Sequence, residues 1–331
     1  MLDRFKALLI TRDEATRAQS VAEAILTPAD LMDGDVDIRV EHSTVNYKDG
    51  LAITGKLPVV RRFPMIPGVD LAGTVLASRA GGVRAGDKVI VNGWGLGETH
   101  FGAYSQMARV SAGWITPLPA AFTTADAMAI GTAGYTAMLA ILALEARGAA
   151  PDGGPVVVTG ASGGVGSMAV SLLSRLGYTV HAVTGREQER AYLAGLGASE
   201  VLPRAEFEGA PRLLGKERFA AAIDSVGGPI LANVLSMTTA GGAVAACGNV
   251  AGFDLATSVA PFILRGIALL GIESSHAAPE RREAAWSRLA RDIDRAKLAG
   301  MTTAMPWSGI VNAAHDIVAG KVRGRLVVEI D

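Results

Sequence analysis

A glycine-rich stretch in the middle of the chain most constrains its fold. Residues 159–166 read TGASGGVG, between a short apolar run at 155–159 and an apolar segment with helical spacing at 166–176. A strand that passes through glycines into a helix is typical of a dinucleotide site, because the backbone N–H groups and the helix N-terminus can then face the pyrophosphate. The fingerprint is imperfect, since Ala161 stands in the place of its first glycine. An ordinary glycine-rich turn is the alternative. A P-loop is disfavoured, because no Gly-Lys-Ser/Thr closes the motif.

Apolar segments alternate in length and spacing from about Thr124 onward. Short runs predict strands, longer Ala- and Leu-rich runs predict helices, and this alternation predicts βαβ units around a parallel sheet. We therefore expect a doubly wound α/β domain over residues 125–298. Its expected strands are 155–159, 178–183, 200–202, 220–223, 242–246 and 267–272, and its expected helices 126–146, 166–176, 187–196 and 279–299.

The first 120 residues show a different pattern. Apolar and polar residues alternate from Val36 to Glu41, and short apolar runs at 73–76 and 87–91 are separated by glycine turns. Alternation with a period of two predicts half-buried strands, so this segment is expected to be all-β. A last strand at 325–330 suggests that the chain returns to the same domain. The expected β-rich domain therefore comprises residues 1–124 and 299–331.

Composition excludes several classes of protein. The 331 residues carry a formal net charge of −1, so no overall positive field attracts nucleic acid or an anionic membrane. Two uncharged stretches, 127–144 and 155–174, approach the length of a membrane span, but the polar residues and glycines in them favour buried elements of an α/β core. Charges interrupt the first ten residues, which therefore lack the apolar region of a signal peptide. We expect a cytoplasmic protein with no nucleic-acid or membrane partner.

The end of the second expected strand indicates which nucleotide binds. An NAD site usually places Asp or Glu there, about 20 residues after the glycines, to bind the ribose hydroxyls. Here the strand runs instead into Thr184, Gly185 and Arg186. A hydroxyl beside a fixed positive charge suits a 2′-phosphate, and Arg204 after the third strand could close the same pocket. We therefore predict NADPH. The alternative is that both arginines are simply solvated.

Several motifs together resemble the medium-chain dehydrogenase/reductase superfamily, and most closely its acryloyl-CoA reductase and quinone-oxidoreductase-like branch. The resemblance implies a GroES-like β-rich catalytic domain beside a Rossmann-type nucleotide-binding domain. It spans most of the chain and rests on NYKD at 46–49, AITGK at 52–56, FPMIPG at 63–68, GTAGYTAM at 131–138, VTGASGGVG at 158–166, ACG at 246–248 and PFILR at 261–265.

The same resemblance implies a set of site residues. It places Tyr47 beside the nicotinamide, where Tyr47 is also the candidate catalytic residue, with Lys48 a weaker one. Asn249, Ile263 and Ser274 would contact the nicotinamide half of the cofactor, and Arg325 would approach its phosphates. The pyrophosphate would be lined by Ser162, Gly163, Gly164 and Val165, and the 2′-phosphate by Thr184, Gly185 and Arg186.

Zinc-dependent relatives use cysteines and a histidine in a Gly-His-Glu motif, whereas this chain has Val69 at that histidine position and one cysteine, Cys247. We expect no metal, and we expect Cys247 to be a small buried residue rather than a nucleophile. Hydride addition to a conjugated thioester needs only hydrogen-bond donors at the developing negative charge.

The expected activity is NADPH-dependent reduction of acryloyl-CoA to propanoyl-CoA. A quinone or enone reductase and a non-catalytic NADPH-binding protein are the alternatives. An acyl-CoA substrate needs a basic rim for its phosphates, for which Arg61, Arg62, Lys321, Arg323 and Arg325 are candidates, although charges on a solvated face are the favoured explanation for them. The segment 267–272 resembles a region through which such proteins pair, so we expect a homodimer.

Overall fold

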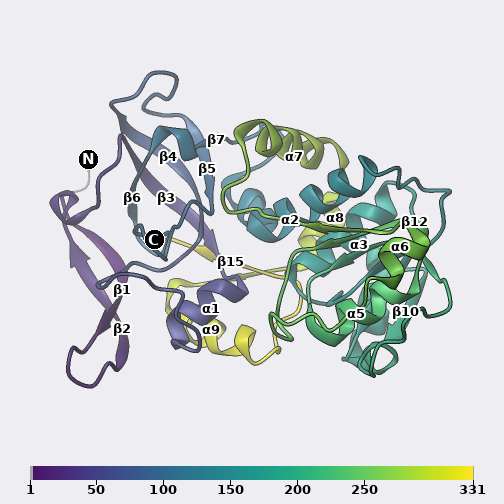
Figure 1. Ribbon diagram of the computed structural model, residues 1–331. Helices are drawn as coiled ribbons and strands as arrows, with labels where there is room; N and C mark the ends of the chain where they lie inside the picture. Colours follow the sequence, from purple (N-terminus) through teal and green to yellow (C-terminus); the bar gives the residue numbers. More distant parts are fainter. Residues whose placement is uncertain (1–2, 331) are drawn as a thin grey trace. The chain divides into compact units, whose positions relative to one another are not determined.

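The protein, seen in a computed structural model that describes residues 3–330, consists of two compact units (Figure 1). The first unit runs to Thr132 and takes in Ser275–Ala278 and the chain from Thr302 onward. The second comprises Ala133–Ser274 and Pro279–Met301. Thr132 lies next to the point where α2 (Thr124–Glu145) is broken at Gly131, whose φ of 50° and ψ of −162° are not helical.

The second unit is built on a six-stranded parallel sheet in the order β10-β9-β8-β11-β12-β13. The chain moves outward from β8 to β10 and then returns to the other side of β8 for the last three strands. This reversal confirms the doubly wound prediction and creates a switch point between β8 and β11, where ligands bind in such sheets. The strands are β8 (Val156–Val158), β9 (Val180–Thr184), β10 (Glu200–Pro203), β11 (Phe219–Asp224), β12 (Thr238–Ala246) and β13 (Ala268–Gly271).

Helices accompany these strands as the alternating pattern predicts, but the helices at Gly228–Met237 and Ala260–Arg265 were not among those expected. Two of the expected helices also differ. The single helix expected at 279–299 is two helices, because Asp294 starts a new one by accepting a hydrogen bond from the Lys297 N–H at 3.0 Å. The turn before α4 is a 3-10 turn at Glu187–Glu189. The helices are α3 (Gly164–Arg175), α4 (Arg190–Leu196), α5 (Gly228–Met237), α6 (Ala260–Arg265), α7 (Pro279–Asp292) and α8 (Arg295–Gly300).

Helix α2 is apolar along most of its length. Its length and composition would allow it to cross a membrane, but 83% of its most apolar window is buried inside the protein. Core helices of soluble proteins share this character, so the helix is weak evidence for a membrane span. The other uncharged stretch, 155–174, forms β8, the glycine loop and most of α3.

The first unit contains a seven-stranded sheet in the order β14-β15-β3-β4-β5-β7, with β6 also paired to β3. The C-terminal strand β15 lies between β14, to which it is parallel, and β3, to which it is antiparallel. A separate hairpin is formed by β1 (Phe5–Arg12) and β2 (Gln19–Leu26). The sheet strands are β3 (Val36–Thr44), β4 (Asp70–Ser78), β5 (Lys88–Asn92), β6 (Met107–Val110), β7 (Thr116–Pro117), β14 (Thr302–Met305) and β15 (Arg325–Glu329).

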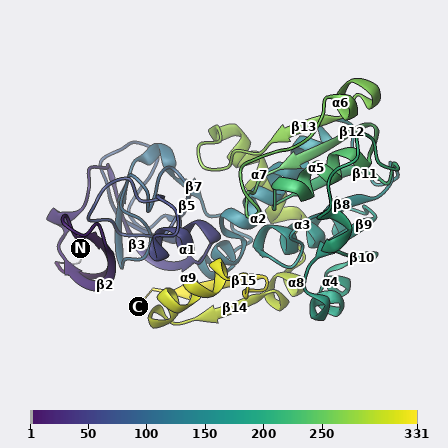
Figure 2. The same ribbon diagram turned by 60° about the horizontal axis from the view of Figure 1, so that its bottom comes forward.

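The expectation of an all-β N-terminal segment is wrong at one element. Residues Tyr47–Thr54 form helix α1, and α9 (Ile310–Val318) packs beside it (Figure 2). The approach is close at Gly50, where a Cβ atom would fall 2.7 Å from the Ile317 side chain. Helix α1 is short, and the helix that packs against it, α9, comes from the other end of the sequence. Local periodicity therefore gave no signal for α1.

Candidate active site

The glycine loop joins β8 to α3 at the switch point of the second unit. Gly160 has a φ of 59°, and a Cβ at Gly166 would collide with the Gly160 carbonyl. The turn therefore needs glycine at these two positions. Ala161 is fully buried, and its N–H donates to the Val183 carbonyl at 3.1 Å. The methyl group at the imperfect position of the fingerprint thus faces the protein interior.

The N-terminus of α3 is suited to an anion. Gly163 precedes the helix and provides no side-chain cap, and the first turn contains no acidic residue. The first N–H groups of a helix have no partner within the helix and carry a partial positive charge. Gly163, Gly164 and Val165 therefore present backbone donors where the resemblance implies a pyrophosphate.

Polar contacts fix the two strand ends beside this loop. The Thr159 hydroxyl donates to Asp224 at 2.6 Å, and the second oxygen of that carboxylate accepts from the Gly227 N–H at 2.7 Å. The Ser225 hydroxyl donates to the Thr159 carbonyl at 3.0 Å. Burial raises the pKa of Asp224, whereas these hydrogen bonds oppose that rise. The ends of β8 and β11 are thereby held together across the switch point.

The predicted 2′-phosphate residues come together at the end of β9. The Arg186 guanidinium donates to the Ser162 hydroxyl at 2.7 Å and to its carbonyl at 3.2 Å. The Thr184 hydroxyl lies 3.2 Å from that of Ser162 and accepts from the Arg186 N–H at 3.1 Å. At Gly185, a Cβ would fall 2.8 Å from Cζ of Arg204.

Two guanidinium groups and two hydroxyls therefore surround the end of β9. The nearby Glu187 forms an ion pair with Arg190, at 2.8 Å, and Arg204 itself pairs with Glu208 at 2.6 Å. A bound ribose hydroxyl would find no carboxylate in the position where NAD sites usually have one, whereas a phosphate would find two arginines. These residues fit the nucleotide end of NADPH.

The residues expected at the nicotinamide half are less closely grouped. Asn249 follows β12, and its Cα would lie 3.3 Å from a Cβ at Gly227, so it lies at the same edge of the sheet as the switch point. Ile263 lies on α6 with 73% of its surface exposed. Ser274 follows β13, and its carbonyl accepts from Arg282 at 3.1 Å. The roles of these three residues stay predictions.

Tyr47 is the first residue of α1 in the first unit. Asn46 precedes the helix, and its N–H donates to the Asp49 carboxylate at 2.8 Å, as in a capping box. Tyr47 is half-buried, and no side chain or carbonyl in residues 3–330 is a hydrogen-bond partner of its hydroxyl. Lys48, the weaker candidate, forms an ion pair with Glu98 at 2.8 Å. Tyr47 thus lies at the capped start of α1, and its role stays a prediction.

A buried polar network lies around the start of α1, and sequence reasoning missed it. Asp70 accepts hydrogen bonds from the Asn46 amide at 2.9 Å, from the Asn92 amide at 2.8 Å and from the Thr132 N–H at 2.7 Å. Asp49 accepts from the Val69 N–H at 2.9 Å. Burial, together with the nearby Asp70, raises the pKa of Asp49 to about 7. A charged residue inside the apolar run 65–76 was the available signal.

Arg325 supplies the positive charge of this network. Its guanidinium is buried and donates to the Ala129 carbonyl at 2.8 Å, the Thr44 hydroxyl at 2.8 Å and the Asn46 side-chain carbonyl at 3.2 Å. The expectation that Arg325 approaches the cofactor phosphates, or forms part of a basic rim, does not fit these contacts. The side chain instead orients Asn46, which directly precedes Tyr47.

Val69, at the histidine position of zinc-dependent relatives, lies in this same network through its N–H. Within the described part of the chain, no three His, Cys, Asp or Glu side chains are grouped so that they could hold a metal ion. Cys247 donates to the Asp224 carbonyl at 3.3 Å, and burial raises the pKa of its thiol to about 12. A thiol with this pKa is a poor nucleophile near neutral pH.

Comparisons with known proteins agree with both units. Residues 32–120 match the alcohol dehydrogenase GroES-like domain, and residues 164–291 match the family described as zinc-binding dehydrogenase. The chain is 46% identical to the acrylyl-CoA reductase AcuI of Ruegeria pomeroyi over 99% of each chain. It belongs to the AcuI branch of the medium-chain dehydrogenases/reductases. The expected GroES-like and Rossmann-type domains are thereby confirmed.

Two solved structures of this branch cover almost the whole chain. The yhdH oxidoreductase from Salmonella enterica, in complex with NADP, has a TM-score of 0.96 and 46% identity, and covers 98% of this chain and 100% of its own. The yhfP protein from Bacillus subtilis, with NAD bound, has a TM-score of 0.94 and 38% identity, and covers 98% and 99%. Nicotinamide cofactors of both kinds are therefore bound in these two similar structures.

Proposed function

We propose that the protein reduces the carbon–carbon double bond of acryloyl-CoA with NADPH and forms propanoyl-CoA. The observation that carries this proposal is the group of Ser162, Thr184, Arg186 and Arg204 at the end of β9, which suits a 2′-phosphate. Membership of the AcuI branch, and the acrylyl-CoA reductase from R. pomeroyi in particular, supports the choice of acceptor.

NADPH, when bound, supplies a hydride for the β-carbon of the thioester. The electron pair of the double bond then moves toward the thioester oxygen, and the α-carbon takes a proton. The protein must stabilise the charge on that oxygen and deliver the proton. Tyr47 is the proposed group for this work, because its hydroxyl has no partner within the described chain.

A substrate panel tests the proposal directly. Acryloyl-CoA, crotonyl-CoA and a simple quinone would each be assayed with NADPH and with NADH. We expect the highest kcat/KM for acryloyl-CoA with NADPH. A higher value for the quinone would replace the proposal with quinone reduction. Tight NADPH binding without turnover of any activated alkene would mean that the protein binds the cofactor without catalysis.

Arg186→Ala tests the cofactor assignment separately. Loss of charge-assisted hydrogen bonds to the 2′-phosphate should raise the KM for NADPH by roughly tenfold or more, and should leave the KM for NADH nearly constant. Arg190→Ala is a matched control four residues away, because Arg190 is paired with Glu187 outside the Ser162–Thr184 group. An unchanged NADPH preference in Arg186→Ala would contradict the assignment.

We further propose a cytoplasmic homodimer. The strand β13 forms one edge of the second unit's sheet, and this is the segment whose sequence resembles a pairing region. An edge strand has N–H and C=O groups that another copy can pair with. Sedimentation velocity would distinguish a dimer from a monomer.

A further inference from the structure

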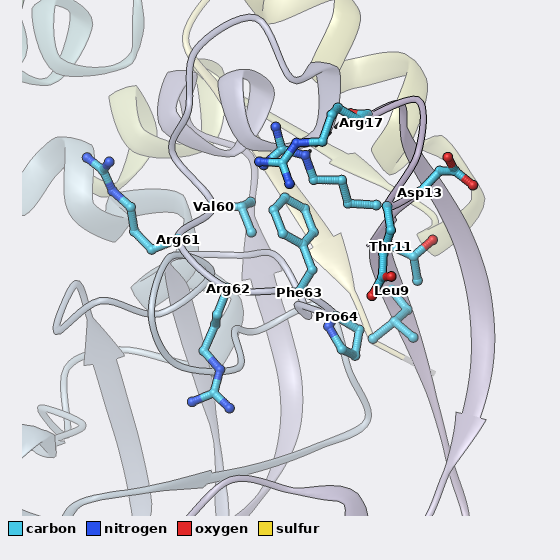
Figure 3. A pocket seen from close by; sticks show the side chains of 11 residues that line it. Leu9, Thr11, Asp13, Arg17, Val60, Arg61, Arg62, Phe63 and Pro64 are labelled. Atoms are coloured by element: carbon cyan, nitrogen blue, oxygen red, sulfur yellow. Dashed lines mark hydrogen bonds between the residues drawn. The ribbon is translucent and has the colours of Figure 1, made fainter.

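The first unit has a groove of about 620 Å³ (Figure 3), and none of the residues that line it belongs to the polar network around Tyr47. It is formed by the turn between β1 and β2 and by the loop that follows α1. Its lining combines four arginines, Arg12, Arg17, Arg61 and Arg62, with an apolar set that includes Leu9, Val60, Phe63 and Pro64.

The groove is positively charged although the whole chain is not. Asp13 and Glu14 also line it, so the four arginines leave a local charge of +2 in a chain of formal charge −1. The Asp13 carboxylate accepts from the N–H and the hydroxyl of Thr16 at 2.7 and 2.8 Å. Within residues 3–330, no carboxylate lies within ion-pair distance of any of the four guanidinium groups. An anion can therefore bind them without displacing an internal partner.

An aromatic ring, that of Phe63, lies beside Arg12 in the groove. Cζ of Arg12 is 5.3 Å from the centroid of the Phe63 ring, and Arg12 Nε donates to the Arg17 carbonyl at 3.3 Å. Arg17 has a φ of 60°, a left-handed conformation that is uncommon for arginine. Figure 3 shows the Phe63 side chain pointing toward Arg17, whereas the Arg61 and Arg62 side chains extend from their loop away from Phe63. Guanidinium groups over apolar and aromatic surface suit a phosphorylated nucleotide, which has anionic groups and a flat base.

Two contacts connect the groove to α1, which begins at Tyr47. The Gln19 amide, at the start of β2, donates to the Ala52 carbonyl near the end of α1 at 2.6 Å. The Arg61 N–H donates to the Glu98 carbonyl at 2.9 Å, and the Glu98 side chain pairs with Lys48.

The length of α1 is similar to that of the pantetheine arm of CoA. At 1.5 Å per residue, the eight residues of α1 span about 12 Å. The pantetheine arm of CoA has thirteen bonds from sulfur to the first phosphorus, or about 15 Å at the spacing of an extended chain.

We propose that this groove binds the nucleotide end of the CoA thioester, with its 3′-phosphate and diphosphate on the arginines. The inference rests on the proposed function and names the residues that hold the non-reacting part of its substrate. The pantetheine arm, at about 15 Å, is as long as α1 or slightly longer, so it can extend from the groove along this helix toward Tyr47. The NADPH 2′-phosphate site is a separate cluster, in the second unit.

The test compares two thioesters that differ only in the nucleotide. Wild type and the double variants Arg12→Gln/Arg17→Gln and Arg61→Gln/Arg62→Gln would be assayed with acryloyl-CoA and with acryloyl-pantetheine. The charge-matched control is Arg84→Gln/Arg212→Gln, at two exposed arginines outside the groove. We expect each groove variant to raise the KM for acryloyl-CoA by roughly tenfold and to leave the KM for acryloyl-pantetheine nearly constant. The two KM values should therefore lie closer together in the groove variants than in the wild type.

Two results would overturn the inference. The first is an equal rise in KM for both thioesters, and the second is a KM for acryloyl-CoA in the groove variants that equals the KM in the control variant. Calorimetry that measures the affinities for CoA and 3′-dephospho-CoA distinguishes failure of the groove assignment from failure of the proposed function. If no acyl-CoA is reduced but CoA binds wild type more tightly than Arg12→Gln/Arg17→Gln, the groove assignment stands and the proposed reaction fails. If acryloyl-CoA is reduced with a KM insensitive to the groove variants, the reaction stands and the arginines are an exposed basic surface only.

Discussion

Gly131→Ala tests how tightly the polar network around α1 is assembled. At a φ of 50° and a ψ of −162°, the backbone of Gly131 adopts a conformation that is essentially restricted to glycine, so an alanine there costs about 1–3 kcal/mol in strain. The new Cβ would also lie 2.7 Å from the Arg325 guanidinium, 2.9 Å from the Asp70 carboxylate and 3.0 Å from the Thr44 methyl group. Forcing these buried groups apart adds about 1–3 kcal/mol. The expected loss of unfolding free energy is therefore about 4 kcal/mol.

Urea denaturation followed by tryptophan fluorescence is a suitable assay. Three of the four tryptophans, Trp94, Trp114 and Trp307, belong to the first unit, so the signal reports mainly on that unit. Gly82→Ala is the matched control, because Gly82 also has a positive φ, 86°, but a Cβ there meets nothing within 4 Å. It should lose only about 1 kcal/mol. Equal losses in the two variants would refute the claim that the packed network adds to the cost of backbone strain at Gly131.

Three further predictions concern single residues. Burial and the nearby Asp224 raise the pKa of the Cys247 thiol to about 12, so the native protein should resist alkylation by iodoacetamide at pH 8 and should react after unfolding. Mass spectrometry measures the alkylation, and rapid alkylation of the native protein would contradict the prediction. Because burial raises the pKa of Asp49 from 3.8 to about 7, its contribution to stability is full below pH 3.8 and is lost as the pH rises through 7. The unfolding free energy of Asp49→Asn relative to wild type should therefore improve from pH 5 to pH 8, and a constant difference would show that Asp49 does not titrate there. Arg288→Met removes ion pairs with Glu145, at 2.8 and 3.0 Å, and with Asp292, at 2.7 Å, and should lower the unfolding free energy by about 1 kcal/mol in urea titrations, whereas an unchanged midpoint would mean that these pairs together contribute nothing.

The sequence predicted the second unit well because its elements are defined locally. Each strand is a short apolar run, and Gly160 and Gly166 identify the turn between the first strand and helix. The residues of the 2′-phosphate group were predictable for a related reason. Thr184, Gly185 and Arg186 directly follow a strand whose direction is set by the parallel sheet, so the loop position determines where their side chains lie.

The first unit was harder to predict because its features depend on distant residues. Alternation along β3 predicts that Asp37 faces solvent, but the side chain is buried against Arg109, which donates to it at 2.6 Å from 72 positions further along. The network around Asp70 similarly combines Asn46, Asn92, Thr132 and Arg325, from four separate segments. Periodicity over a short window carries no information about such contacts.

The position of β15 has a consequence for the order in which the chain acquires its structure. The first unit cannot complete its sheet until Arg325–Glu329 has left the ribosome, because this strand lies between β3 and β14. The second unit needs no residue beyond Met301 and can fold while the N-terminal strands still wait for their last neighbour. Pairing across nearly 300 residues is slow, because the closure of so long a loop precedes any gain from the contacts. During synthesis, β3 therefore exposes an unpaired edge, and a chain that stops shortly before residue 325 would be more prone to aggregate than one that lacks only the final residue.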